Sequence, residues 1–536
     1  MQQWETPTPP LRRNGLTRRE LLRQGAMLGL GASALGALAA CAQGGQAPQP
    51  AAPAAVAPTP SGPAGQITVA QSSDVLTLDP SKDTSPISLN VFKSVFDQLT
   101  DIRRDGSVGP LLATSWKSQD AITWEFTLVP GARFHSGEPV TVEDVLWTYQ
   151  AIMADARSPV QAYTVAIEKI EKVDDRTVRF VTKYPYAPFP RQVSLISILP
   201  RATYERLGPE QFALRPVGSG PYKVVEWRKD DQLILETNAE YFGGAPAIRR
   251  VVFRPVPSES SRLAGLESGA LDIVPLLPPS ELQRLRRLSG IRVELVESNR
   301  NLYVGINTTT PPLDNLKLRQ AIDVAIDRQA ITRDLLSGLG KPVGQPVAAV
   351  TFGYDPAIPP SPYDPELARR LVRESGYRGE EILFQYPNNR YQFGNEVAQA
   401  VASALEAVGI RVKLEGMEYS AFFPLWTGKR LSGLHLFAFG PSIMDADLPL
   451  SSLYETGPSR GYWSSPEVDA LIKQQRAAID PTERQRLISR IWQISKENVP
   501  YVWLYTEIQA YGIRERVDWK PRADERLLMQ EAKLRG

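Results

Sequence analysis

Short strand-like stretches and amphipathic helical stretches alternate along residues 66–536. The segment Trp124–Leu128 alternates apolar and polar residues with the period of two that is typical of a half-buried strand, and Pro130-Gly131 then turns the chain. Further strand patterns occur at 66–70, 177–180 and 233–235. No internal repeat of about 20–50 residues is visible. The alternation predicts lobes of the α/β class.

Three helical patterns have recognisable ends. Thr141 is expected to cap a helix that begins at residue 142, with Asp144 at the capping-box position. Asp314 is expected to cap a second helix. The apolar face of that second helix consists of Leu318, Ile322, Ala325 and Ile326. A third helix, closed by Gly409, has the apolar face Val397, Val401, Leu405 and Val408.

The first 41 residues have the organisation of an export signal. Arg18 and Arg19 lie in a segment that resembles the twin-arginine export signal. An uncharged run rich in Gly and Ala follows over residues 26–40, and Leu38-Ala39-Ala40-Cys41 resembles the lipobox of bacterial lipoproteins. We therefore expect an extracytoplasmic protein that is anchored to the cell membrane by a lipid on Cys41, on the periplasmic or cell-surface face.

Two alternatives concern this signal segment. An uncleaved transmembrane anchor is disfavoured, because the run over 26–40 has 15 residues and a helix needs about 20 to span the hydrocarbon core. Its small residues also suit a signal peptide better than a membrane helix. The general secretory route remains open beside twin-arginine export.

Composition is ordinary for a soluble globular protein, with 42% hydrophobic and 22% charged residues in a chain of 536. This length allows two or three domains. Cleavage before Cys41 would remove five arginines and two glutamates, which changes the formal net charge from +2 to −1. That balance gives no reason to expect nucleic-acid binding. Cys41 is the only cysteine, so lipidation would leave no thiol for a disulfide, a thiolate metal site or a nucleophile.

Residues 42–65 consist largely of Ala, Pro, Gly and Gln. Such a segment buries too little apolar surface to offset its ordering entropy. It is typical of a flexible tether between an anchor and a folded body. The folded body is expected to begin with the strand at residue 66.

Four passages in the body resemble one protein family. They are WEFTLVPGARFHSGEPVTVEDV at 124–145, GSGPYK at 218–223, NTTTPPLD at 307–314 with RQAI at 319–322 and AIDR at 325–328, and GYWSSPEVDALI at 461–472 closing with PYVWLY at 500–505. Their order and spacing resemble family 5 of the extracytoplasmic solute-binding proteins of ABC importers, which includes dipeptide-, oligopeptide- and nickel-binding members. The resemblance covers nearly the whole chain after the tether.

The resemblance implies a two-lobed periplasmic-binding-protein-like fold of type II, cluster C, with a discontinuous first lobe. Lobe one is expected over 66–303 and 501–536, with an extra subdomain over about 105–213. Lobe two is expected over 304–500. A solute would bind in the cleft between the lobes, and hinge closure would produce the form that a membrane permease recognises.

Arg390 is the sharpest candidate for a ligand contact. It lies beside Tyr391 in the segment Tyr386–Tyr391, just before the third helix. In dipeptide-binding relatives an arginine of this segment pairs with the ligand carboxylate, and the resemblance implies that role for Arg390. A guanidinium fork can hold a carboxylate through two hydrogen bonds. A solvated surface arginine and an interlobe salt bridge are the alternatives.

Ser442 departs from the family pattern. In peptide-binding members an aspartate at the matching position, three residues before an Asp-Pro-Asp-like turn, binds the α-amino group of the ligand. A hydroxyl cannot neutralise an ammonium group, so Ser442 puts a ligand with a free peptide N-terminus in doubt. Asp445 and Asp447 could compensate, although such residues more often hold a turn through bonds to the backbone. Phe439 and Trp463 are expected to wall the cleft or to belong to the core.

Metal and catalytic sites are not expected. His135 and His435 are far apart in the chain and lack a second ligand at short spacing, and the turn around His135 suggests a structural bond. Gly218-Ser219-Gly220 lacks the spacing of a nucleophile elbow. The glycines before Lys341 lack the spacing of a P-loop. The chain therefore needs a partner for energy, and no cofactor is expected.

The predicted function is that of a lipid-anchored, monomeric substrate-binding protein, not an enzyme. It would capture a peptide-like or other small polar solute and deliver it to the permease and ATPase subunits of an ABC importer. An exported hydrolase and a transporter-independent solute receptor on the same scaffold are the alternatives. Adjacent reading frames for a permease and an ATPase would favour the first over the receptor.

Overall fold

The computed structural model describes residues 65–535, except residues 389 and 458. All described residues belong to one unit, Gly62–Gly536. The arginine pair, Cys41 and nearly all of the expected tether lie outside the described residues. The predictions on export, lipidation and the tether therefore stay predictions.

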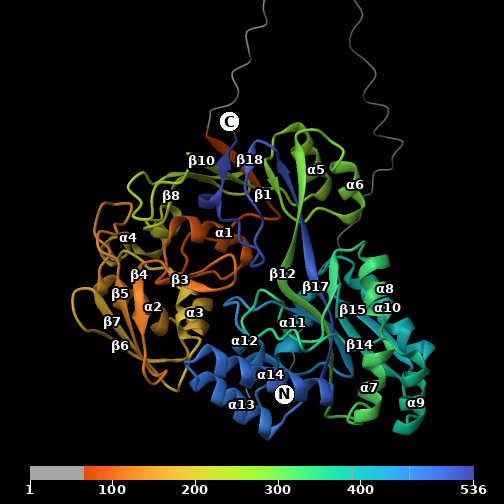
Figure 1. The fold of residues 1–536 in the computed structure, drawn as a ribbon. Coiled ribbons are helices and arrows are strands. Elements are labelled where there is room, and N and C mark those ends of the chain that lie inside the picture. Colours follow the sequence, from red (N-terminus) through yellow and green to blue (C-terminus); the bar gives the residue numbers. More distant parts are fainter. Residues whose placement is uncertain (1–64, 389, 458, 536) are drawn as a thin grey trace, which may run out of the picture. The chain divides into compact units, whose positions relative to one another are not determined.

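A large mixed sheet runs through this unit (Figure 1). Its strands, in spatial order, are β15 (Val412–Met417), β14 (Ile382–Pro387), β16 (Leu434–Phe439), β12 (Ile291–Ile306), β17 (Tyr501–Arg514), β11 (Ile273–Val274), β1 (Gln66–Gln71), β10 (Arg250–Pro255), β9 (Gln232–Thr237) and β8 (Tyr222–Arg228). β13 (Gly340–Pro342) pairs with β17 outside this path. The strands predicted at 66–70 and 233–235 are β1 and β9.

β12 and β17 are the longest strands, and they lie side by side in antiparallel register. Ile291 pairs with Arg514 at one end of the ladder, and Gly305 pairs with Tyr501 at the other. The register shifts between Glu297 and Asn301, so the three residues between them have no ladder partner on β17, and it shifts again between Leu302 and Tyr303. The pair therefore runs through the large sheet with two irregularities, of which the first is the larger.

A separate four-stranded antiparallel sheet has the order β4 (Ala113–Lys117), β5 (Thr123–Leu128), β7 (Thr177–Thr182) and β6 (Ile167–Lys172). The period-two strands predicted at 124–128 and 177–180 are its two central strands. Two small ladders pair β2 (Thr100–Ile102) with β3 (Val108–Pro110) and β18 (Val517–Asp518) with β19 (Lys533–Leu534).

Helices cover the sheets and connect their strands (Figure 1). The α-helices are α1 (Pro86–Val95), α2 (Val142–Ala154), α3 (Phe189–Gln192), α4 (Arg201–Leu214), α5 (Glu259–Ser268), α6 (Leu282–Leu285), α7 (Leu316–Ala325), α8 (Arg328–Ala330), α9 (Pro365–Ser375), α10 (Gly394–Ala407), α11 (Tyr419–Thr427), α12 (Asp447–Pro449), α13 (Pro466–Ala477) and α14 (Pro481–Asn498). Short 3₁₀ or π turns are η1 (Pro159–Tyr163), η2 (Val193–Leu195), η3 (Pro279–Glu281), η4 (Ile331–Leu335), η5 (Leu450–Tyr454) and η6 (Met529–Glu531).

The predicted helix ends agree with the structure at two of three places. Thr141 caps α2, and Thr141 and Asp144 form the complete capping box. Gly409 has a φ of 90° just after α10, a conformation that suits glycine. The cap predicted at Asp314 is wrong, because the side chain of Asn315 accepts the hydrogen bonds from the N–H groups of Lys317 and Leu318. Aspartate and asparagine cap almost equally well, so the sequence does not decide between two neighbours.

The three larger of the buried cores stabilise these layers. The largest surrounds β12, β14, β16 and β17 and draws its residues from between Leu302 and Tyr505. A second packs α1 against β1, β9 and β10. A third lies between α2 and the four-stranded sheet and includes Phe126, Tyr149 and Phe180. Each buries several large aromatic side chains, each of which contributes roughly 1.5–3 kcal/mol when it is fully buried.

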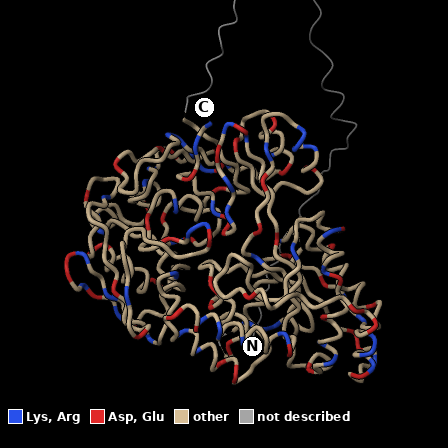
Figure 2. The backbone as a smooth tube through the Cα atoms, in the orientation of Figure 1, with Lys and Arg blue, Asp and Glu red and all other residues tan. Residues whose placement is uncertain are grey.

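Charged residues of both signs are interspersed along the described chain, as Figure 2 shows. No helix within the described ranges combines the length and the apolar character that a membrane span needs.

Candidate functional site

Three loops meet at one edge of the large sheet. β14 pairs in parallel with both β15 and β16, so the carboxyl ends of these strands point the same way. In open α/β sheets ligands bind beyond the carboxyl ends of the strands. Arg390 follows β14, Tyr419 begins α11 directly after β15, and Ser442 follows β16. A binding site is therefore expected at this edge of the sheet.

Arg390 lies at this edge with its side chain exposed. Its guanidinium carbon is 5.0 Å from the ring centre of Tyr419 and 5.6 Å from that of Tyr391. Such cation–π contacts contribute roughly 0.5–1 kcal/mol at exposed sites. Among the described residues Arg390 forms no ion pair, so its charge is available to a ligand.

The three aromatic candidates pack into the protein. The Tyr391 side chain is 8% exposed, and its hydroxyl accepts a hydrogen bond of 3.0 Å from the Ala438 N–H. This bond holds the Arg390 loop against β16. Phe439 is buried at the end of β16, opposite Asn301. Trp463 is half-buried and meets the Tyr454 ring edge-on at 6.4 Å.

Asp445 is fully buried and held by two arginines. Its carboxylate oxygens accept hydrogen bonds of 2.5 and 2.7 Å from Arg484, and Arg191 Nε lies 3.4 Å away. The Asp447 N–H also donates to Asp445 Oδ1 at 2.9 Å, which is the turn-holding bond considered from the sequence. Burial alone would raise the pKa of Asp445, but the two arginines hold it below its usual value. These contacts leave little of the carboxylate for a ligand.

The largest cavity described here has a volume of about 840 Å³. Ser442 lines it and is half-buried. One wall comes from residues 162–195, including Tyr163, Tyr184 and Leu195. The opposite wall comes from residues 442–476, including Asp447, Arg460 and Arg476. Small-molecule sites typically enclose about 300–1,000 Å³, so this cavity has the size of a solute site.

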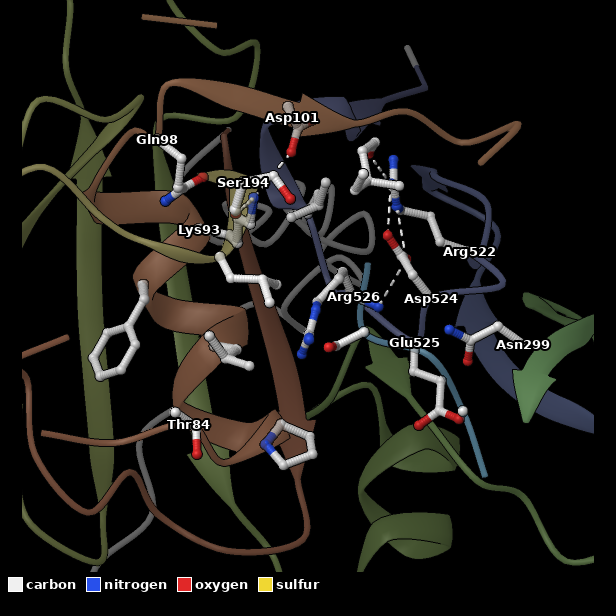
Figure 3. A pocket seen from close by; sticks show the side chains of 18 of the residues that line it. Thr84, Lys93, Gln98, Asp101, Ser194, Asn299, Arg522, Asp524, Glu525 and Arg526 are labelled. Atoms are coloured by element: carbon white, nitrogen blue, oxygen red, sulfur yellow. Dashed lines mark hydrogen bonds and ion pairs between the residues drawn. The ribbon is translucent and has the colours of Figure 1, made fainter. Parts of the chain in front are cut away.

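A smaller cavity of about 170 Å³ adjoins the large one, because Tyr163, Leu195 and Ser442 line both. Figure 3 shows two ion pairs among its charged side chains. Lys93 contacts Asp101 at 3.0 Å, and Arg522 contacts Asp524 at 2.7 Å. The two cavities are adjacent, and Ser442 belongs to the lining that they share.

Arg390 and Tyr391 line a different cavity, of about 400 Å³. This cavity and the small cavity share one lining residue, Arg300. The Arg300 side chain contacts Glu507 at 3.2 Å and Glu525 at 2.8 Å. The structure thus separates Arg390 from Ser442 by this ion-pair network. Phe439, Asp445 and Trp463 line none of these three cavities.

Comparison with known proteins decides which family this arrangement belongs to. Residues 107–461 match the family model of the bacterial extracellular solute-binding proteins, family 5. The chain belongs to that family. It is 28% identical over 472 residues to the probable D,D-dipeptide-binding periplasmic protein DdpA of Escherichia coli (strain K12), covering 85% of this chain and 91% of the relative.

Solved structures share the fold of this family 5 binding protein. HbpA2 from Haemophilus parasuis superposes with a TM-score of 0.80 at 23% identity, covering 88% of this chain and 100% of that one. The ABC transporter-associated periplasmic binding protein DppA from Helicobacter pylori, in complex with the peptide STSA, gives 0.73 at 24% identity, covering 88% and 98%. The predicted two-lobed, type II α/β fold is confirmed.

Sequence reasoning missed one candidate residue in this binding protein. Arg460 lines the large cavity, and its guanidinium carbon is 4.8 Å from the ring centre of Trp426. It directly precedes the passage 461–472 that carries the family resemblance, which is the only local signal. Its approach to Trp426 depends on tertiary contacts that no periodicity reveals.

The histidines have structural surroundings. His135 Nδ1 accepts a bond of 3.3 Å from the Gly218 N–H, and Nε2 lies 3.0 Å from the Gly220 carbonyl oxygen, so the predicted structural bond is confirmed. His435 is buried beside Tyr303, with no hydrogen-bond partner at Nδ1. Within the described ranges no group of three or more His, Cys, Asp or Glu residues is placed to hold a metal ion.

The pKa of His435 predicts a pH effect on stability. Burial lowers this pKa from 6.5 to about 3, whereas the unfolded chain keeps the ordinary value. Between these values only the unfolded state binds the proton, so the contribution of His435 to stability is complete above pH 6.5 and decreases as the pH falls. As the pH falls below 6.5, the unfolding free energy of the wild-type protein should decrease by about one kcal/mol per pH unit more than that of His435→Phe.

Urea unfolding of both proteins at pH 7.5, 6.0 and 5.0 measures this effect. The difference in unfolding free energy at pH 7.5 is the control, because His435 is neutral in both states there. Parallel pH profiles would show that His435 does not titrate differently on unfolding.

Proposed function

We propose that this family 5 protein is the substrate-binding component of an ABC importer and captures a peptide-like or other small polar solute. The observation that carries the proposal is the cavity of about 840 Å³ between residues 162–195 and residues 442–476. The relatives support it, because DdpA is described as D,D-dipeptide-binding and DppA holds a peptide. As a component of an ABC importer, the protein would deliver its solute to the permease and ATPase subunits.

Closure of two lobes is part of the proposal. We place lobe one at 66–303 and 501–536, with its subdomain at about 105–213, and lobe two at 304–500. With these limits the walls of the large cavity come from different lobes. A solute that contacts both walls binds the closed form more tightly and shifts the population towards it.

The ligand contacts proposed here are Ser442 in the large cavity and Arg390 with Tyr391 in the neighbouring one. The hydroxyl of Ser442 can donate to or accept from a polar group but cannot neutralise an ammonium group. A solute whose amino group is absent or blocked therefore suits the cavity better than one with a free α-amino group. Roles for Phe439, Asp445 and Trp463 would require a rearrangement of their packing or ion pairs.

The anchor remains part of the proposed function. We place the mature protein outside the cytoplasmic membrane, with a lipid on Cys41 and with residues 42–65 as a tether. The arginine pair at 18 and 19 supports twin-arginine export. A protein held near the permease by a lipid meets it more often than a freely diffusing one.

Solute capture should be directly observable. We expect the exported protein, solubilised in mild detergent, to release a non-covalently bound small solute in native mass spectrometry. Readdition at a hundredfold excess over the dissociation constant should stabilise the protein by about 2.7 kcal/mol in thermal unfolding. Ser442→Trp should abolish capture, because an indole would occupy the point where two cavities meet.

The matched control is Ser136→Trp, which adds the same side chain at an exposed turn. It should retain the solute. Release of a hydrolysed product instead of the intact solute would favour the exported hydrolase. Equal capture by Ser442→Trp and the wild-type protein would contradict the assignment of the cavity.

A further inference from the structure

One arginine of the large cavity has no acidic partner among the described residues. Arg460 is half-buried and stacks on Trp426, which is itself 3% exposed. Within the described residues the Arg460 side chain forms no ion pair and no hydrogen bond. A guanidinium group stays charged and carries five donors in a fixed fork. Arg460 therefore presents a fixed, unsatisfied positive charge to the cavity.

The two carboxylates of the same cavity are paired with one arginine. Arg476 donates to Asp447 at 2.8 Å and to Glu455 at 2.9 and 3.0 Å. Lys473 also lines the cavity, is exposed, and forms no ion pair among the described residues. The charged lining consists of three cations and two carboxylates, so its net formal charge is +1, and both carboxylates are paired with Arg476. The uncompensated charge that faces a solute is positive.

An aromatic row on α11 supports Arg460 and connects it to the Arg390 edge. Tyr419 and Phe423 have ring centres 5.4 Å apart, and Phe423 and Trp426 have ring centres 5.7 Å apart. Arg390 lies over the Tyr419 end of the row, and Arg460 lies over the Trp426 end. Stacking on a ring restricts a guanidinium group without using its hydrogen-bond donors. Arg460 is therefore held in place while its donors remain free.

We infer that Arg460 binds an acidic side group of the solute, so that the cavity selects acidic, peptide-like molecules. The inference rests on the proposed function, because it names the class of solute for that site. It adds a second anion contact to the one proposed for Arg390. Ser442 agrees with it, since a solute with no ammonium group and an acidic side group matches the hydroxyl of Ser442 and the guanidinium group of Arg460, which line the same cavity.

Two peptides that differ by one isosteric group test this inference. The probes are N-acetyl-Glu-Ala-Ala and N-acetyl-Gln-Ala-Ala, which share a blocked N-terminus and a C-terminal carboxylate. Titration calorimetry on the solubilised full-length protein should show at least about tenfold tighter binding of the Glu peptide, as expected for a charge pair inside a cavity. Arg460→Gln should reduce that preference to less than about threefold.

Two further variants keep the test decisive. Arg460→Lys should retain most of the preference, because it keeps the charge, and it guards against loss of binding through misfolding. Arg490→Gln removes one positive charge from an exposed ion pair on α14, and should leave the preference unchanged. Both variants and Arg460→Gln should unfold at closely similar temperatures.

Three outcomes would overturn the inference. They are equal binding of the two peptides by the wild-type protein, binding of neither peptide, and an undiminished preference in Arg460→Gln. The proposed function is judged separately, by the solute that mass spectrometry finds in the purified protein. A co-purified solute without an acidic side group would remove this inference and leave solute capture intact.

Discussion

Replacement of Asp445 by asparagine is expected to lower the free energy of unfolding by about 3–5 kcal/mol. The substitution leaves Arg484, which is 5% exposed, without its carboxylate partner, and it also removes the charge beside Arg191. A buried charge that loses its counter-ion keeps its full desolvation cost. The shape of the side chain hardly changes, so the effect isolates the charge.

Denaturant unfolding at neutral pH measures this difference. Glu467→Gln is the matched control, because Glu467 contacts Arg490 at 3.1 Å through side chains that are 59% and 44% exposed. Exposed pairs of this kind contribute only about 0–1 kcal/mol. An Asp445→Asn variant no less stable than Glu467→Gln would show that the buried arginines find other partners.

Replacement of Cys41 by serine is expected to abolish attachment of the mature protein to the membrane. Cys41 carries the only thiol of the chain, and the lipobox match ends on it. The preceding uncharged run of 15 residues would form a helix of about 22 Å, shorter than the hydrocarbon core of about 30 Å. The variant should therefore appear as a released soluble body or accumulate as unprocessed precursor.

Detergent phase partition of exported protein distinguishes these states. Ala42→Ser, one residue further along, is the control and should partition like the wild-type protein. Attachment of the Cys41→Ser variant at the wild-type level would rule out the lipid anchor and favour an uncleaved membrane segment.

Local features of this fold could be predicted from the sequence because neighbouring residues decide them. Thr141 and Asp144 cap α2 through bonds within one turn. β5 follows from five alternating residues that pack on one face. The cap of α7 is Asn315 and not Asp314, and the sequence could not distinguish them because these two neighbours cap almost equally well.

The site was less predictable because distant segments build it. Asp445 becomes an ion-pair partner through Arg484, which lies 39 residues away in the chain. Ser442 and Arg390 are candidates from the same resemblance, yet the pairing of β12 with β17 places Arg300 between their cavities. Arg460 has no carboxylate partner among the described residues, whereas Arg476 binds both carboxylates of the same cavity. None of these relations leaves a trace in periodicity or spacing.

The register shift in the β12–β17 pair has a mechanical consequence. Ladder pairing continues on both sides of residues 298–300, but these three residues have no ladder partner on β17, and Arg300 contacts that strand only through its side chain. A two-stranded ribbon bends with least loss where its ladder is already interrupted. Arg300 therefore lies at the interruption, where the strand pair is expected to bend, and also in the lining of two cavities. A molecule that fills either cavity would contact the bending point directly.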